Sequence, residues 1–168
     1  MDKDEAIEVV LDDELDNIID YLINCKNNNE NVYVDYKCDN GIFRLYSSDI
    51  DIDETYERIY GLTKEQKLQY EKELNESDNK DEVIAKYNNM IEVYFDKMRD
   101  FSTRVDVAGK TLDEVVAIIK EAKKLNKNIY VDYKPANGDA SIRFFSMNIN
   151  LNREIMDVLG IEIIGLDN

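Results

Sequence analysis

The sequence predicts an α+β protein built from two divergent β-α-β-β-α repeats that are joined by a helical segment. The segment NVYVDYK at 31–37 recurs as NIYVDYK at 128–134, and such self-similarity is the signature of a duplicated structural unit. An amphipathic helical pattern precedes each copy of this segment, and an Asn-Gly pair typical of a hairpin turn follows it. These three observations define the order of elements in both repeats.

Each repeat is expected to begin with a short apolar strand and a long amphipathic helix. In the first repeat, residues 1–61, the strand lies near 7–11 and the helix starts at Asp12 or Asp13, because aspartate is a favoured N-cap. From Leu15 onward, apolar residues recur at i, i+3, i+4 and i+7, which gives this helix one buried face.

A β-hairpin over 31–47 and a short helix complete the first repeat. Asn40-Gly41 lies between two alternating runs, and both residue types tolerate the positive φ of a tight hairpin turn. The short helix has Asp53 as its expected N-cap and ends at Gly61, since glycine readily takes the left-handed conformation of a helix C-cap.

The second repeat, residues 103–168, follows the same order. A strand near 104–107 comes first, and Thr111 with Glu114 forms a capping box at the start of the long helix. A second hairpin is expected to turn near Asn137-Gly138.

The end of the second repeat is predicted from a short apolar pattern. The short helix has Asn152 as its expected N-cap and Gly160 as its C-cap, and a last strand covers 161–165. The second repeat would then be β-α-β-β-α-β, an order compatible with a ferredoxin-like split arrangement.

Residues 62–102 form the predicted helical connector. Thr63 and Gln66 resemble a capping box, and NESDNK at 75–80 is the expected break between two helices. One apolar stripe runs along the second helix, comprising Val83, Ile84, Tyr87, Met90, Ile91, Tyr94, Met98 and Phe101. Such a stripe is either part of the core or the seam of a homodimer.

Alternation along the two hairpins separates a core face from a polar, aromatic face. The core face of the first hairpin holds Val34, Tyr36, Phe43 and Leu45. The other face carries a quartet in each repeat: Tyr33, Asp35, Arg44 and Tyr46, then Tyr130, Asp132, Arg143 and Phe145. Each quartet is either a cross-strand ion pair flanked by rings or a contact surface, between the repeats or with a partner.

The composition limits the classes of function. Acidic residues outnumber basic ones 37 to 21, a net charge of −16, so direct binding of nucleic acid or of an anionic membrane is not expected. The chain has no histidine and no glycine-rich phosphate loop, and we therefore expect no enzyme activity, no cofactor and no metal. The start of the chain and its two cysteines predict a cytoplasmic protein.

The negative charge is concentrated in the first repeat, which has 17 acidic and 5 basic side chains, whereas the second has 10 and 9. Asp49, Asp51 and Asp53 align with Asn148, Asn150 and Asn152. On a strand, carboxylates at i and i+2 lie about 6.5–7 Å apart, which is comparable with the spacing of phosphates along a nucleic-acid strand. The candidate partner-binding residues are Asp49, Asp51, Asp53, Glu54, Asp12, Asp13, Glu14 and Asp16.

Two other interpretations of these acids stay open. A solvated acidic face keeps a small protein soluble without any partner. The spacing of Asp49, Asp51 and Asp53 also resembles the start of a calcium loop, but Glu54 stands where an EF-hand needs glycine. Only a weak calcium or magnesium site of another kind would fit.

The block LYSSDIDIDETYERIYGLTKEQ at 45–66, with VYVDY just before it, resembles a segment of small acidic uncharacterised proteins from Firmicutes genomes and their phages. The resemblance covers about residues 31–75 and implies an origin in a mobile element, with no established activity. Mobile elements often encode small acidic inhibitors, including anti-restriction and anti-CRISPR proteins.

The sequence therefore favours a non-enzymatic inhibitor whose acidic first repeat occupies a basic, nucleic-acid-binding surface of a target protein, as a nucleic-acid mimic. The alternative is a structural or self-associating module that uses the quartets or the stripe at 83–101.

Overall fold

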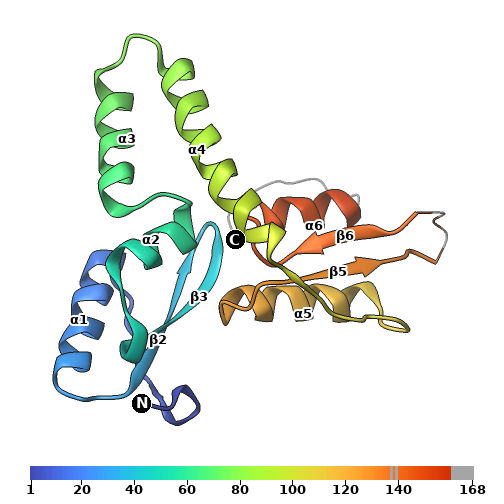
Figure 1. The fold of residues 1–168 in the computed structure, drawn as a ribbon, viewed down its shortest axis with the longest axis horizontal. Coiled ribbons are helices and arrows are strands. Elements are labelled where there is room, and N and C mark those ends of the chain that lie inside the picture. Colours follow the sequence, from blue (N-terminus) through green and yellow to red (C-terminus); the bar gives the residue numbers. More distant parts are fainter. Residues whose placement is uncertain (137, 139, 160–168) are drawn as a thin grey trace. The chain divides into compact units, whose positions relative to one another are not determined.

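A computed structural model of the chain describes residues 1–136, 138 and 140–159 (Figure 1). The order β-α-β-β-α occurs twice, with a pair of helices between the two occurrences. The α+β class and the duplication are thereby confirmed. Contacts divide the chain into two compact units, unit 1 (Met1–Tyr36 and Phe43–Tyr94) and unit 2 (Lys37–Ile42 and Phe95–Asn168), and each is described by itself. The sequence division at 1–61, 62–102 and 103–168 follows the repeats and stays a prediction.

The elements of the first repeat follow the predicted order with shifted ends. They are the 3-10 helix η1 (Lys3–Glu5), β1 (Ile7–Glu8), α1 (Leu15–Asn27), β2 (Val32–Cys38), β3 (Gly41–Tyr46), the 3-10 helix η2 (Ser47–Asp49) and α2 (Ile52–Tyr60). The sheet has the order β1-β2-β3, and β1 is parallel to β2. The first strand has two residues, so the prediction of a strand over 7–11 was too long.

One face of the β2-β3 hairpin contributes to the core of unit 1. Val34, Phe43 and Leu45 are at most 3% exposed, as the alternation predicted, whereas Tyr36 on the same predicted face is only partly buried. Figure 1 shows α1 and α2 side by side, and their buried apolar side chains include Ile18, Ile19, Leu22 and Ile59. Burial of each such side chain contributes about 1.5–3 kcal/mol to folding, so the apolar face predicted for α1 is the face that holds it in place.

The hairpin turn lies one residue earlier than predicted. Asp39 and Asn40 form the turn, and Gly41 is the first residue of β3 with φ of +129°. Only glycine takes such a backbone conformation without strain, so the Asn-Gly signal located the hairpin correctly for a slightly different reason. Gly61 ends α2 in the left-handed conformation with φ of +76°, as predicted.

The connector forms two helices, α3 (Lys64–Glu76) and α4 (Lys80–Asp100), which Figure 1 shows as an antiparallel hairpin. The capping box of Thr63 and Gln66 is present, and the chain breaks within the predicted segment. Between the helices, the rings of Tyr70 and Tyr87 stack with centroids 4.5 Å apart.

The apolar stripe of α4 is only partly buried. Tyr87 is 3% exposed, whereas Phe101 at the other end of the predicted stripe is 74% exposed. Leu68 on α3 and Val93 on α4 are also more than half exposed. Tyr87 is buried and Phe101 is exposed, and the other six positions of the stripe are partly buried, so the stripe is not a continuous piece of core.

Unit 2 contains the second repeat: β4 (Thr103–Arg104), α5 (Leu112–Lys124), β5 (Ile129–Tyr133), β6 (Ile142–Phe145) and α6 (Leu151–Leu159). The capping box of Thr111 and Glu114 is confirmed. The sheet order is β4-β5-β6, with β4 parallel and β6 antiparallel to β5. Because β4 and β5 are direct neighbours, the described strands lack the split order of a ferredoxin-like fold. Asn137, Gly160 and the predicted strand at 161–165 lie outside the described residues.

Both helices of the second repeat pack on one face of its sheet. The buried cluster joins α5, the β5-β6 hairpin, α6 and the segment between β4 and α5; its members are Val107, Val115, Ile119, Val131, Phe144, Leu151 and Ile155. The second repeat is thus a two-layer arrangement of helices on a sheet, and the quartet occupies the other sheet face.

A buried serine holds the same position in both repeats, which the sequence analysis did not detect. Ser47 is fully buried, and its hydroxyl accepts from the backbone N–H of Val32 (3.0 Å) and donates to the carbonyl of Glu30 (2.8 Å). Ser146 makes the same two bonds, at 2.9 and 2.7 Å, at the matching backbone positions of the second repeat. In each repeat the hydroxyl thus links the end of the second hairpin strand to the start of the first hairpin strand by hydrogen bonds.

Candidate protein-binding surface

The acids predicted to bind a partner form two clusters on unit 1. We call them the α1 cluster (Asp12, Asp13, Glu14 and Asp16) and the α2 cluster (Asp49, Asp51, Asp53 and Glu54). Seven of the eight residues are exposed, and Asp16 is partly buried. Their side chains are therefore directed largely into solvent, as binding residues require.

The α1 cluster surrounds the start of α1. The N-cap is Glu14, whose side chain makes no capping bond in the described part of the chain, so the prediction of Asp12 or Asp13 as N-cap was wrong. Instead, one carboxylate oxygen of Asp13 accepts from the Asn17 amide (2.9 Å) and from the N–H of Glu14 (2.7 Å). These bonds lower the pKa of Asp13, the Asn17 bond most strongly, so Asp13 carries its charge at neutral pH.

The α2 cluster lies on a 3-10 turn and a helix start, not on a strand. Asp51 is the N-cap of α2, and its carboxylate accepts from the N–H of Glu54 at 2.9 Å. Asp53 is inside the helix, so its prediction as N-cap was wrong. The strand spacing of 6.5–7 Å does not apply to these acids, because η2 turns the chain before α2 begins.

The two clusters lie at opposite ends of α1. Asp16 in the first turn of α1 accepts from the hydroxyl of Tyr56, in the middle of α2. At the other end, Asp51 and Asp53 line an open hollow of about 440 Å³ together with Asn27, the last residue of α1. A helix of 13 residues is about 20 Å long, so the eight acids do not form one contiguous patch.

Asp20 is the acidic residue that sequence reasoning missed. It is exposed and lies one helical turn beyond Asp16 on α1, between the two clusters. The spacing of i and i+4 was visible in the sequence, but its relation to the α2 cluster depends on the antiparallel packing of α1 and α2. With Asp20 included, carboxylates follow the α1-α2 pair from one end to the other.

Two lysines of unit 1 reduce the charge of these clusters. Lys3 lies 2.5 Å from a carboxylate oxygen of Asp49, and Lys64 lies 3.4 Å from Asp16. Exposed pairs of this kind contribute about 0–1 kcal/mol each, and within the described residues they involve two of the eight acids. The surface of the two clusters therefore keeps most of its negative charge.

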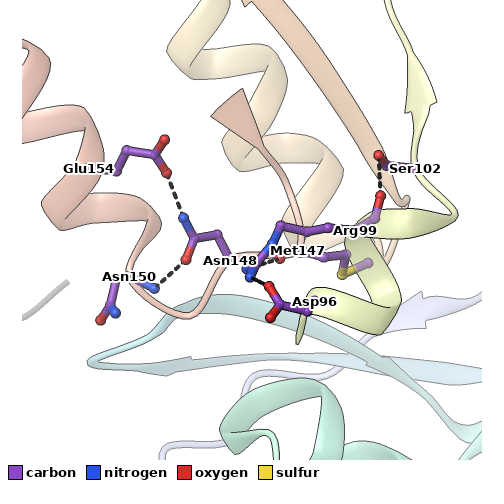
Figure 2. A network of polar contacts seen from close by, with 7 residues as sticks. All are labelled: Asp96, Arg99, Ser102, Met147, Asn148, Asn150 and Glu154. Atoms are coloured by element: carbon purple, nitrogen blue, oxygen red, sulfur yellow. Dashed lines mark hydrogen bonds and ion pairs between the residues drawn. The ribbon is translucent and has the colours of Figure 1, made fainter. Parts of the chain in front are cut away.

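Figure 2 shows the side-chain contacts of Asn148, one of the three aligned asparagines of the second repeat. Asn148 donates from its amide to Glu154 at 2.5 Å and accepts from the N–H of Asn150 at 3.1 Å. Burial raises the pKa of Glu154, and the bond from Asn148 partly offsets this. Asn152 was wrongly predicted as the N-cap of α6, which already begins at Leu151. At Asn148, the amide is therefore explained by its hydrogen bonds to Glu154 and Asn150.

Asn148→Asp is expected to lower the free energy of unfolding by about 1–2 kcal/mol at pH 7, since it replaces a donor by a second carboxylate beside Glu154. The pair would raise the folded-state pKa of Glu154 further above its unfolded value. A carboxyl with a raised pKa in the folded state destabilises the protein only once the pH rises high enough to ionise it. Urea unfolding should therefore show a smaller loss of unfolding free energy for Asn148→Asp at pH 4.5 than at pH 7.

Asn150→Asp is the matched control, because it adds the same charge two residues away and Asn150 bonds Asn148 through its backbone N–H, which the substitution keeps. It should leave stability nearly unchanged, since aspartate is acceptable at the start of a helix. Equal losses for both variants would contradict the role assigned to the Asn148 amide.

The quartets form ion pairs flanked by rings. Arg44 makes two hydrogen bonds to Asp35 (2.8 and 3.0 Å), and its guanidinium lies 4.1 Å from the ring centroid of Tyr33. The rings of Tyr33 and Tyr46 are 5.7 Å apart. Bidentate pairing raises the pKa of Arg44 above its ordinary value, so this quartet is largely satisfied by its own members.

The second quartet has the same geometry with greater exposure. Arg143 bonds Asp132 at 2.8 and 3.1 Å and lies 4.3 Å from the ring centroid of Tyr130. The side chain of Arg143 is 51% exposed, against 20% for Arg44. An open hollow of about 690 Å³ adjoins it, lined also by Arg99 and Phe145. A contact role for the quartets stays a hypothesis, and this one is the more accessible.

Within residues 1–136, 138 and 140–159, no group of three or more Cys, Asp or Glu side chains is arranged to hold a metal ion. No helix in the described part of the chain is long and apolar enough to cross a membrane.

The fold and this surface define a duplicated α+β protein whose first repeat carries two exposed acidic clusters on a helix pair. Comparison with protein-family models, with curated proteins and with solved structures finds no match to the chain.

Proposed function

We propose that this chain is a non-enzymatic, cytoplasmic inhibitor that binds the basic, nucleic-acid-binding surface of a target protein. The observation that supports the proposal is the series of exposed carboxylates along α1 and α2, from the α1 cluster through Asp20 to the α2 cluster. These charges lie in the helices or just before their first residues, and an ordered set of charges is complementary to a surface that binds phosphates.

Electrostatic complementarity of this kind has a characteristic salt dependence. Rates of association and affinity both fall as the ionic strength rises, because exposed charges are screened within about 8 Å at physiological salt. A face that only keeps the protein soluble responds to total charge. A mimic of nucleic acid depends instead on where the charges lie, and this difference can be measured.

The triple variant Asp49→Asn, Asp51→Asn, Asp53→Asn tests the position of the charges. Asparagine caps a helix as well as aspartate does, and the Lys3–Asp49 pair is exposed, so the variant should fold. The control variant Glu65→Gln, Glu76→Gln, Asp78→Asn removes three charges from exposed positions of the connector. Both variants have the same net charge, so any difference in binding between them is due to the positions of the removed charges.

The immobilised protein is incubated with host lysate, and bound protein is eluted with duplex DNA. We expect the triple variant to retain about tenfold less DNA-eluted partner than the control variant, as loss of roughly 1.4 kcal/mol predicts. The affinity for the purified partner should fall as salt rises from 50 to 200 mM. Equal capture by the two variants, or a partner that DNA does not displace, would refute the proposal.

The second candidate is a self-associating module. The observation in its favour is the exposure of Leu68, Val93 and Phe101 on the α3-α4 hairpin and its end, because exposed apolar residues are common at interfaces between subunits. Light scattering at low and high salt discriminates between the candidates, since an apolar dimer persists at high salt.

A further inference from the structure

A cavity of about 390 Å³ lies within unit 2, where the hairpin tip at 37–42, the C-terminal half of α5 and the start of α6 come together. Sites for small molecules typically occupy about 300–1,000 Å³, so this volume is suited to a small organic ligand. None of the lining residues belongs to the acidic clusters.

The lining is basic although the chain is acidic. Four of its residues are lysines, and Glu121 is the one acidic residue among the described lining residues. Glu121 lies 3.2 Å from Lys124 and so offsets one of the four charges. The lysines are Lys37, Lys120, Lys123 and Lys124. A concave site with this excess of ammonium groups attracts anions.

Lys123 is buried within this lining. It is 8% exposed, and its ammonium group donates to the backbone carbonyl of Asn148 at 2.9 Å. The aligned residue of the first repeat, Lys26, is exposed, so the fold of the repeat does not require a buried lysine here. A buried ammonium lowers stability unless an anion or polar group compensates for its lost hydration.

The N-terminus of α6 adds to the positive potential. Leu151 and Asn152, the first two residues of this nine-residue helix, both line the cavity. A helix N-terminus carries about half a positive charge and presents backbone N–H groups that bind phosphate and carboxylate oxygens. The helix end and the lysines therefore converge on one volume.

We propose that this cavity binds the phosphate group of a small phosphorylated molecule. Several ammonium groups and a helix N-terminus match a dianion with three acceptor oxygens better than a single carboxylate. None of the described lining residues is aromatic, so the cavity offers no ring on which a nucleobase would stack. The ligand is thus a phosphorylated compound without a base, and no covalent step is involved.

The test uses the full chain with inorganic phosphate and glycerol 3-phosphate as probes and glycerol as the uncharged control, at constant ionic strength. Nuclear magnetic resonance titration should show saturable shifts of the Gly41 and Asn152 amides with a Kd of about 1 mM or lower. Lys120→Gln should weaken binding about fivefold. Lys110→Gln removes the same charge from an exposed position outside the lining and should leave the affinity unchanged.

Lys123→Met should abolish the phosphate-induced shifts of the Gly41 and Asn152 amides. If this variant fails to fold, the proposal is tested by the titrations of the wild type, Lys120→Gln and Lys110→Gln. The proposal is overturned if neither phosphate probe produces saturable shifts at about 10 mM. It is equally overturned if glycerol binds as well as glycerol 3-phosphate, or if the Lys110 and Lys120 variants weaken binding to the same extent.

Discussion

Ser47→Ala is expected to lower the free energy of unfolding by about 2–4 kcal/mol, and Ser146→Ala by a similar amount. Each hydroxyl is fully buried and satisfies one backbone N–H and one backbone carbonyl. Alanine leaves both groups without a partner in a site closed to water, and each such group costs about 1–3 kcal/mol. Urea unfolding followed by far-ultraviolet circular dichroism measures the loss.

Ser48→Ala is the control for this prediction. Its hydroxyl oxygen is buried and has no hydrogen-bond partner among the described residues, so its removal should change stability by less than about 0.5 kcal/mol. If Ser47→Ala and Ser48→Ala change the free energy of unfolding by the same amount, the two hydrogen bonds of Ser47 do not stabilise the hairpin.

Lys123→Met is expected to increase the stability of the protein at pH 7 and to decrease it above pH 10. Burial lowers the pKa of Lys123 from 10.5 to about 8, although Cys38 nearby opposes this shift. The unfolded chain therefore binds more protons than the folded chain between pH 8 and 10.5, and wild-type stability rises with pH across that window. Below pH 8, the full cost of the buried charge is present.

The size of the expected change in stability follows from the lowered pKa of Lys123. A difference of this size corresponds to at most about 3 kcal/mol at pH 7, and methionine gives up the bond to the Asn148 carbonyl, worth about 1 kcal/mol. The expected net gain in the free energy of unfolding at pH 7 is about 2 kcal/mol. At pH values where the lysine of the wild type is neutral, only the loss of the hydrogen bond remains. Unfolding in urea at pH 7, 8.5 and 10 measures both.

The pH series is best measured in a Cys38→Ala background, because burial raises the pKa of the Cys38 thiol and this thiol interacts with Lys123. Lys120→Met on the exposed side of α5 is the control and should not stabilise the protein at pH 7, because it removes no buried charge. A constant difference between Lys123→Met and wild type would show that Lys123 is not perturbed by burial. A gain at pH 7 would also fit a lysine retained for ligand binding at the expense of stability.

Several elements were predictable because their signals are local. The capping boxes at Thr63 and Thr111 involve residues three apart, and the alternation that buries Val34 and Phe43 follows from the period of a strand. The cross-strand pairing of Asp132 with Arg143 followed from the hairpin register. Such patterns are set by backbone geometry and do not depend on distant parts of the chain.

Predictions that needed an exact residue were less accurate. The N-cap of α2 is Asp51 rather than Asp53, because η2 changes the direction of the chain first. The turn lies at Asp39 and Asn40 rather than at Asn40-Gly41. Several aspartates and asparagines stand close together at these helix and strand ends, and each is a competent cap or turn residue, so composition alone does not select one.

The sequence by itself determined the duplication, the order of elements, the apolar faces and the excess of acid in the first repeat. Only the tertiary structure decided that the acids form two clusters bridged by Asp20, that Asn148 bonds Glu154, and that Lys123 is buried in a basic cavity. The reason is physical: periodicity and capping act over a few residues, whereas electrostatic potential and burial depend on which distant segments pack together.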